Sequence, residues 1–177
     1  MRNCSILFLG VASAAALAAA DSNDLLGSLP GHIAINDRLH VSAQPSVEAL
    51  KKLKEAGVGT VIDLRPDDET PDLDEKAVVE KSGVAYQSLP IAGKAGLTKA
   101  NVAAFDRLLT QAEQGKVLLH CASGNRVGAM MALRARWTQG KSVEESLAIG
   151  KASGLTGLAV EVTQLLSTDA ASAASPR

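Results

Sequence analysis

Short apolar runs alternate along the chain with longer segments in which apolar side chains recur every three or four positions. A short run of β-branched and apolar residues between Gly or Pro breaks is typical of a strand. The recurring pattern is typical of one face of a helix. The clearest strand pattern is the run TVIDL, which lies between Gly59 and Pro66. The predicted strands are residues 40–42, 60–64, 84–89 and 116–120.

Capping residues mark the ends of the predicted helices. Ser46 is suited to an N-cap, and Gly57 is suited to the position just after a helix ends. Ser142, followed three residues later by Glu145, has the pattern of a capping box. Pro71 fits the first position of another helix. The predicted helices cover residues 46–57, 71–83, 98–115, 126–140, 142–154 and 157–166.

Strands of this length alternating with helices favour βαβ units, in which the strands are parallel and helices cover the sheet. The sequence therefore predicts an α/β domain with a mostly parallel sheet of four to five strands flanked by helices. Binding sites in such sheets form at the carboxyl ends of the strands. Loops at residues 65–70, 90–97 and 121–126 each follow a predicted strand, so we expect them to converge at one edge.

The first twenty residues have a different pattern. Arg2 precedes an uncharged stretch, residues 6–20, that ends in three alanines. This is the pattern of a cleavable secretory signal peptide, and its strongly apolar part is too short to span a bilayer well. We therefore expect an exported protein with no stable membrane anchor after cleavage. The predicted organisation is a signal peptide at residues 1–20, a domain at residues 21–167 and a flexible tail at residues 168–177.

Composition narrows the classes of function. The formal net charge is −1 and the isoelectric point is near 6.3, so the chain lacks the basic surface expected for nucleic-acid binding. Only 2% of the residues are aromatic, which argues against stacking platforms for single-stranded nucleic acid. Of the two cysteines, Cys4 lies in the leader, and cleavage would leave Cys121 alone. A single thiol in an exported protein is either buried and inert or present for its chemistry.

The segment KVLLHCASGNRVGAM contains a predicted strand, a short loop and the start of a predicted helix. Cys121 would be the first loop residue, Gly124 would let the backbone turn tightly, and Arg126 would lie in the first helical turn. Five consecutive backbone amides would then face a common hollow at the positive end of the helix, which suits an oxyanion. They belong to Ala122, Ser123, Gly124, Asn125 and Arg126.

This loop pattern predicts a thiol nucleophile beside an anion site. Arg126 can hold a phosphate-like group through two N–H donors, and the same field would favour the thiolate form of Cys121. The alternative is a structural turn with a buried cysteine, which any one of these residues alone would favour. We expect a phosphorylated substrate or a small oxyanion as the partner, with no cofactor. No His, Cys or Asp spacing suggests a metal, and the pattern leaves the oligomeric state open.

His120-Cys121 followed by Gly124 and Arg126 resembles the phosphate-binding loop of cysteine-dependent protein tyrosine and dual-specificity phosphatases. Upstream, HVSAQPS and TVIDLRPDDE resemble the bacterial phosphatase-like family best known from beta-lactamase hydrolase-like proteins. The resemblance covers about residues 35–165. It implies a phosphatase-like α/β fold, a phosphocysteine intermediate on Cys121 and a periplasmic location for the exported chain.

The loop departs from the usual phosphatase pattern, which is Cys-x5-Arg followed by Ser or Thr. Here four residues separate Cys121 from Arg126, and Val127 and Gly128 follow. A Cys-x4-Arg loop also occurs in rhodanese-like sulfurtransferases, where the cysteine carries a persulfide. The leading interpretation is an exported cysteine-dependent phosphatase. The alternatives are a rhodanese-like sulfurtransferase, another thiol enzyme, or a non-catalytic oxyanion-binding module.

A second departure concerns the general acid. Phosphatases of this type place an Asp on a neighbouring loop, but residues 90–97 contain no acid. The nearest acids are Asp67, Asp68 and Glu69, of which Asp67 is the candidate general acid and Asp68 its substitute. They could instead be solvated acids that stabilise the start of the next helix. His120 is predicted to order the cysteine loop through its ring N–H.

Other polar residues near the predicted site have less specific patterns. Arg65 is a second anion contact or part of a surface salt bridge, and only the resemblance brings Gln44 towards the site. His32 and His40 are isolated in the sequence and are expected to be structural or exposed. Trp137 is expected to pack in the core.

Overall fold

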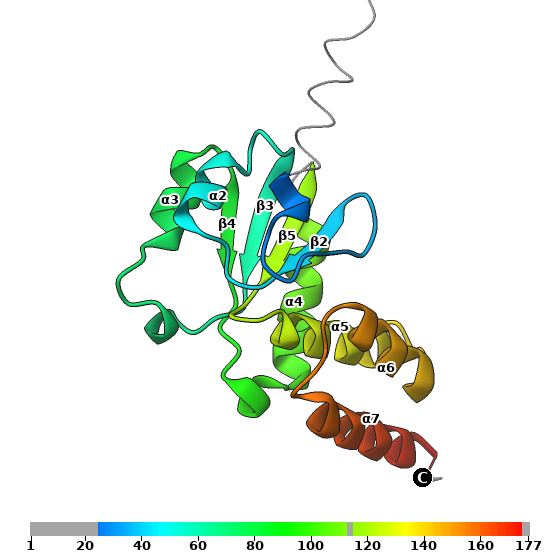
Figure 1. The fold of residues 1–177 in the computed structure, drawn as a ribbon. Helices are drawn as coiled ribbons and strands as arrows, with labels where there is room; N and C mark the ends of the chain where they lie inside the picture. Colours follow the sequence, from blue (N-terminus) through cyan, green and yellow to red (C-terminus); the bar gives the residue numbers. More distant parts are fainter. Residues whose placement is uncertain (1–24, 113–114, 175–177) are drawn as a thin grey trace, which may run out of the picture.

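A computed structural model describes residues 25–112 and 115–174, which form a five-stranded sheet flanked by helices (Figure 1). The strand order is β1-β2-β5-β3-β4. Only the β1–β2 pair is antiparallel, and the other three pairs are parallel. The predicted α/β class with a mostly parallel sheet is therefore confirmed. The predicted signal peptide lies outside the described residues.

The elements follow the predicted alternation. The strands are β1 (Ile33–Ala34), β2 (Leu39–Ser42), β3 (Val58–Asp63), β4 (Ala85–Ser88) and β5 (Lys116–His120). The helices are α2 (Val47–Lys52), α3 (Glu75–Lys81), α4 (Lys99–Gln111), α5 (Asn125–Trp137), α6 (Val143–Ala152) and α7 (Ala159–Ala174). Two short 3-10 turns, η1 (Asp67–Glu69) and η2 (Gly93–Gly96), follow β3 and β4.

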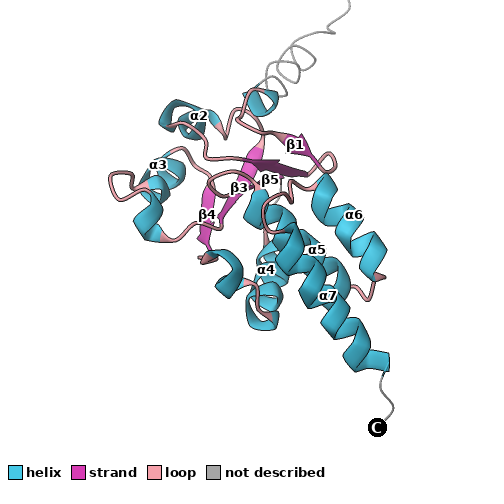
Figure 2. Ribbon diagram, turned by 60° about the horizontal axis from the view of Figure 1, so that its bottom comes forward, coloured by secondary structure: helices cyan, strands magenta, loops and turns pink. Residues whose placement is uncertain are grey.

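Helices cover both faces of the sheet (Figure 2). Successive side chains of a strand point to opposite faces, and β5 shows the result. Val117 and Leu119 join the core with α4, α5 and α7, whereas Leu118 joins the core with α2 and α3. All three side chains are fully buried. The strand that leads to Cys121 is thus fixed from both faces, which gives the following loop a rigid base.

The parallel strands end at the same edge of the sheet, as predicted. The end of β3 and the end of β5 are in register, because Asp63 pairs with His120. Ser42, at the end of β2, pairs with His120 on the other side of β5. The loops after β3, β4 and β5 therefore start from one edge, which places residues distant in sequence around a common site.

Two boundaries differ from the prediction. α3 begins at Glu75 and not at Pro71, because the side chain of Asp74 caps the helix by accepting from the Ala77 N–H at 2.9 Å. α7 continues through Ala174, so residues 168–174 of the predicted flexible tail are helical. The alanine-rich sequence of that segment explains the difference, since Ala has the highest intrinsic helix propensity.

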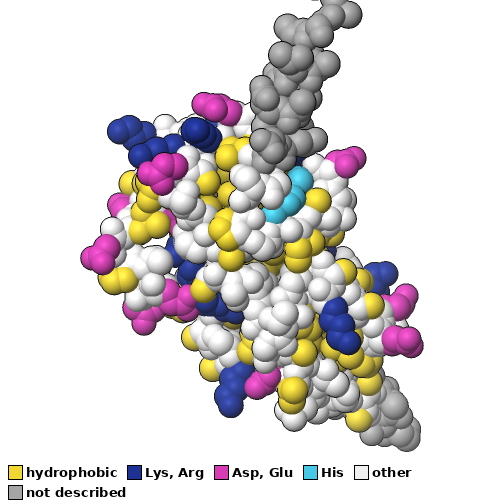
Figure 3. Space-filling model, in the orientation of Figure 1, with side chains coloured by type: hydrophobic (Ala, Val, Ile, Leu, Met, Phe, Trp, Pro, Cys, Tyr) yellow, Lys and Arg dark blue, Asp and Glu magenta, His cyan; other side chains and the backbone are white. Residues whose placement is uncertain are grey.

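The surface carries charged side chains of both signs. Acidic side chains gather at the left edge of the view, over the segment that carries η1 and leads into α3 (Figure 3). None of the described helices combines the length and the apolar character needed to cross a bilayer. The acidic edge borders the carboxyl ends of the strands, where the candidate site lies.

Candidate active site

Cys121 directly follows β5, in the loop that leads into α5. Its side chain is 0% exposed, and its Sγ accepts a hydrogen bond from the Gly124 N–H at 3.1 Å. Gly124 is the N-cap of α5 and has a φ of 82°, a left-handed conformation that glycine adopts without a Cβ clash. The sulfur therefore lies against a backbone donor at the positive end of a 13-residue helix.

The other loop residues divide into exposed and anchored positions. Ala122 and Ser123 are exposed. Asn125 is half-buried, and its Oδ1 accepts from the N–H groups of Thr156 and Leu158 at 2.8 and 3.2 Å. The Asn125 side chain thus attaches the loop to the segment before α7. Its contribution to an anion site would come from its backbone N–H.

Arg126 lies in the first turn of α5 and is 9% exposed. Its two terminal nitrogens donate to the two carboxylate oxygens of Glu69 at 2.7 and 2.6 Å. Nη1 also donates to the carbonyls of Leu64 and Ile91 at 3.5 and 3.3 Å. Burial alone would lower the pKa of Arg126, but hydrogen bonding to Glu69 and the neighbouring Cys121 raise it above its usual value. The guanidinium is therefore a permanent positive charge beside the cysteine loop.

The three acids of η1 face different surroundings. Glu69 reaches Arg126, whereas Asp67 lines a separate cleft of about 490 Å³ together with Arg65 and Tyr86. Asp67 and Asp68 are exposed, and neither side chain forms a hydrogen bond or ion pair with another described residue. The structure thus brings Glu69 into contact with the predicted anion-binding arginine. The roles of Asp67 as general acid and of Asp68 as its substitute stay predictions.

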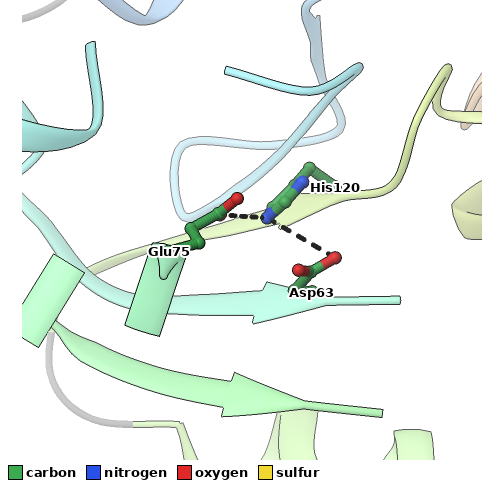
Figure 4. A group of neighbouring side chains, drawn as sticks. All are labelled: Asp63, Glu75 and His120. Carbon is green, nitrogen blue, oxygen red and sulfur yellow. Dashed lines mark ion pairs between the residues drawn. The ribbon is translucent and has the colours of Figure 1, made fainter. Parts of the chain in front are cut away.

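A buried group of ionisable side chains joins the ends of β3 and β5 to α3 (Figure 4). His120 Nε2 lies 2.8 Å from Glu75 Oε1 and 3.8 Å from Asp63 Oδ1. The three side chains are at most 3% exposed. Because His120 directly precedes Cys121, this group connects the start of the cysteine loop to α3. The loop-ordering role of His120 stays a prediction.

Arg65 completes this buried group. Its Nη2 lies 2.6 Å from both Asp63 Oδ2 and Glu75 Oε2, and its Nη1 donates to Thr70 Oγ1 at 2.7 Å. Burial by itself lowers the pKa of Arg65, but its bonds to Asp63 outweigh this and raise it. Of the two predicted roles, the structure places Arg65 in a salt bridge, although the bridge is buried and not at the surface.

Asp63, Glu75 and His120 are also the described residues whose ligand atoms lie close enough together to hold a metal ion. Arg65 already donates to both carboxylates, so an added cation would meet a fixed positive charge. Gln44 Nε2 also donates to Glu75 Oε2 at 2.8 Å, which makes this oxygen less available as a metal ligand. The arrangement fits an ion-pair network better than a metal centre.

Gln44 also contacts the cysteine loop, because its backbone N–H donates to the Ala122 carbonyl at 3.4 Å. The loop after β2 therefore adjoins the loop after β5. Tyr86 donates from its hydroxyl to Asp63 Oδ2 at 2.9 Å, and burial followed by the Asp63 charge raises the pKa of Tyr86. The Tyr86 hydroxyl therefore keeps its proton and stays a hydrogen-bond donor to Asp63.

Sequence reasoning missed two members of this edge. Glu75 lies in the first turn of a helix, where an acid is expected for the helix dipole alone. Tyr86 lies in β4 and has no neighbouring motif. The pairing of Asp63 with His120 had a weak signal in the sequence, since both residues stand at or near the ends of predicted strands.

Residues 33–173 match the family described as DSP-PTPase phosphatase fused to NAD+ kinase. A beta-lactamase hydrolase-like protein of Xylella fastidiosa is 35% identical over 124 residues, which is 68% of this chain and 28% of that protein. One of Agrobacterium fabrum is 33% identical over 98 residues, or 53% and 22% of the two chains. The chain thus spans about a quarter of the length of these relatives.

Solved structures show a related fold. A candidate phosphatase of Neisseria meningitidis is 26% identical, with a TM-score of 0.61 over 73% of this chain and 94% of that one. A DUF442 protein of Shewanella putrefaciens has a TM-score of 0.64 at 24% identity, over 86% and 96% of the two chains. A cysteine-to-serine form of TpbA of P. aeruginosa, in complex with pTyr, has a TM-score of 0.54 at 20% identity, over 76% and 81%.

Proposed function

Because this chain belongs to the family of DSP-PTPase phosphatases fused to NAD+ kinase, we propose that it hydrolyses a phosphomonoester through a phosphocysteine intermediate on Cys121. One observation carries the proposal. Cys121 and the charged fork of Arg126 lie on one loop at the N-terminus of α5, beside a backbone donor to the sulfur. A helix N-terminus and a bidentate arginine together suit a transferring phosphoryl group.

The proposed reaction has two displacements at phosphorus. The Cys121 thiolate attacks phosphorus and the ester P–O bond breaks, so the leaving oxygen takes a proton from the general acid. Water then attacks the phosphocysteine, gives a proton back to the carboxylate of the general acid, and the P–S bond breaks, which releases phosphate and returns the thiolate. Arg126 and the loop amides stabilise the charge on the equatorial oxygens during both displacements.

Asp67 is the proposed general acid, with Asp68 as its substitute. Both lie on η1, which follows β3 at the edge where the cysteine loop begins. Their exposed side chains have no partner among the described residues, so they are free to turn towards a bound substrate. A positioned acid contributes typically about 10²–10⁴-fold to such a reaction.

The substrate is proposed only as a class. TpbA binds pTyr in its complex, which favours a phosphorylated ligand for a protein of this fold. The described chain has few aromatic side chains to stack on a phenyl ring, so the proposal extends to any phosphomonoester. We further propose that the chain acts after export to the periplasm, since the first twenty residues have the pattern of a leader.

A paired assay tests the proposed chemistry. Purified protein receives an aryl phosphate in one reaction, and thiosulfate with cyanide in another. We expect phosphate release, and Cys121→Ser is expected to reduce it by at least about 10³-fold because the nucleophile is lost. Arg126→Lys keeps the charge but loses the fork, and should cost roughly 10²-fold.

The same assay separates the alternatives. Thiocyanate formation without phosphate release would contradict the phosphatase and support a sulfurtransferase. Binding of inorganic phosphate with neither activity would support an oxyanion-binding module. Asp67→Asn should flatten the decline of rate at alkaline pH, which reports loss of the acid's proton. Asp72→Asn, an exposed change three residues after Glu69, is the matched control and should keep the wild-type profile.

A further inference from the structure

The contact between Arg126 and Glu69 has the form of an oxyanion complex. A carboxylate presents two coplanar oxygens to a guanidinium in the same forked geometry as two oxygens of a phosphate. Both terminal nitrogens of Arg126 donate to Glu69, one to each oxygen, at 2.7 and 2.6 Å. The edge formed by the two terminal nitrogens, which a phosphoryl group could bind, is therefore already occupied by a residue of the protein itself.

The surroundings hold Arg126 firmly and hold Glu69 weakly. The Arg126 side chain is 11% exposed, and the carbonyls of Leu64 and Ile91 accept from its Nη1. The Glu69 side chain is 35% exposed and lies on a 3-10 turn with no buried residue. The carboxylate can therefore leave for solvent while the guanidinium stays in place, because among the described residues only the arginine side chain has further partners.

On these grounds we propose that Glu69 is a displaceable carboxylate latch, which occupies the oxyanion position at Arg126 and competes with the phosphoryl group for it. The inference rests on the proposed function, since it takes Arg126 as the anion site. Glu69 then acts as a specificity-determining residue: a ligand enters only if its anionic group binds the fork more strongly than a tethered carboxylate does. Dianionic phosphomonoesters meet this condition better than carboxylates or monoanions.

The latch reduces the apparent affinity for every anion by the fraction of molecules in which it is open. Removing the Glu69 charge should therefore tighten anion binding. A residue whose role is to hold Arg126 in a productive position would have the opposite effect, because its loss would let the fork move. The sign of the change in affinity separates these two roles.

Calorimetric titration with inorganic phosphate measures this sign. The full chain carries Cys121→Ser, so that no covalent step or turnover contributes. In that background Glu69→Gln keeps the shape of the side chain but places an amide N–H₂ against the guanidinium. We expect phosphate to bind about tenfold more tightly, since a charge-assisted bidentate contact no longer has to be broken first. Glu69→Ala, which removes the group entirely, should act in the same direction.

Asp72→Asn is the matched control. It removes the same charge from the same exposed loop, and Asp72 has no partner among the described residues. Its phosphate affinity should stay within about twofold of the parent, because Asp72 is exposed and forms no hydrogen bond or ion pair with Arg126, and an exposed charge is screened by salt. Equal tightening by Asp72→Asn and Glu69→Gln would contradict the latch and indicate a general effect of net charge. Unchanged or weaker binding in Glu69→Gln would also contradict it.

Kinetics with Cys121 intact provide a second readout. Glu69→Gln should lower the KM for an aryl phosphate by a similar factor. Failure of the proposed function would look different. In that case Arg126→Met would not weaken phosphate binding, or the wild-type chain would release no phosphate. Failure of the latch alone would leave both of those results as expected, with no gain in affinity on Glu69→Gln.

Discussion

At the scale of single residues, Arg65 and Arg126 show two uses of a buried guanidinium. Arg65 donates to two carboxylates whose side chains are only 2–3% exposed, so its partners have no access to solvent. Arg126 has one carboxylate partner, which is 35% exposed. A buried pair is costly to break because each charge would remain without a partner, whereas an exposed partner can be exchanged for another anion. This difference places Arg65 in the buried ion-pair network and supports the proposed exchange of anions at Arg126.

Asp63 makes the stability of the fold depend on pH. Burial alone would raise its pKa, but hydrogen bonds from Arg65 and the charge of His120 outweigh burial and lower the pKa below its usual value. The stabilisation that such a carboxyl provides is fully present above its pKa in the unfolded chain, about 4. It is lost as pH falls through its pKa in the folded protein. The free energy of unfolding, measured in urea, should drop by about 1–3 kcal/mol more in the wild type than in Asp63→Asn between pH 5 and pH 2.

Asp72→Asn is the control for this titration, because it removes an exposed acid that has no partner among the described residues. It should keep the wild-type slope of stability against pH. An Asp63→Asn protein with that same slope would show that another group carries the acid sensitivity. At pH 7 the Asp63→Asn protein should itself be less stable, by about 3 kcal/mol, since Arg65 loses a buried partner.

The residues of the candidate site differ in how far they could be predicted from the sequence. Cys121, Gly124 and Arg126 lie close together in one loop, so one short pattern contains them. Glu75 is 45 positions before His120, and their contact depends on how α3 packs against the sheet. Glu69 is one of three consecutive acids, but no spacing rule indicates which acid of η1 turns towards Arg126. A contact between two elements can be predicted only when the fold is known, whereas a contact within one loop can be predicted from the local sequence.

At the scale of elements, the start of α5 is set by packing as well as by chemistry. Val127 is fully buried in the core, and Gly128 lies directly against the backbone of Leu155, between α6 and α7. These two positions follow Arg126, where a phosphatase loop usually has a Ser or Thr. Packing against neighbouring segments therefore constrains both positions that follow Arg126.

Gly128→Ala tests this close approach. A Cβ at position 128 would lie 2.1 Å from the Leu155 backbone nitrogen and 2.6 Å from its Cα, so α5 and the segment at Leu155 would have to separate. We expect a loss of about 3 kcal/mol in the free energy of unfolding, as for severe overpacking. Urea denaturation followed by circular dichroism measures it.

Gly27→Ala is the matched control, since nothing lies within 4 Å of a Cβ at that position. Its stability should stay within about 0.5 kcal/mol of the wild type. If both variants are equally stable, α5 is not constrained at Gly128 as described. A large loss in Gly128→Ala should also weaken phosphate binding, because α5 carries Arg126.

Element prediction succeeded where local signals were complete. The capping box of α6 is present, with Ser142 and Glu145 each accepting from the other's backbone N–H. β1 was not predicted, because a two-residue strand has too little sequence for a pattern. The start of α3 was misplaced because Pro71 and Asp74 are both suitable N-terminal residues, and the structure shows that Asp74 is the one that caps the helix.

At the scale of the whole molecule, the strand order explains how one site draws on distant segments. The order β1-β2-β5-β3-β4 places β5 in the centre, between β2 and β3. The loops that follow these strands bring Gln44, Glu69 and Cys121 to the same edge. The resemblance to cysteine-dependent phosphatases and to beta-lactamase hydrolase-like proteins is confirmed at this scale by the matched family and relatives.

The predicted leader also belongs to the whole chain. Expressed from its full coding sequence in a bacterium, the protein should be recovered from the periplasm with Asp21 as its first residue, as intact mass and N-terminal sequencing would show. Ala20→Phe places a bulky side chain where the cleavage site requires a small one, so this variant should keep the leader. Recovery of the wild type from the cytoplasm with Met1 present would contradict export.

The complete burial of Cys121 also makes its sulfur a probe of motion. An alkylating reagent can reach the sulfur only while the loop is open, so its rate of modification reports how often the site opens when closing is fast. Trp137, the chain's one tryptophan, stands at the other end of α5, about 20 Å of helix away, and its fluorescence follows unfolding of the domain. Together the two side chains distinguish local opening of the proposed anion site from global unfolding in a protein without added labels.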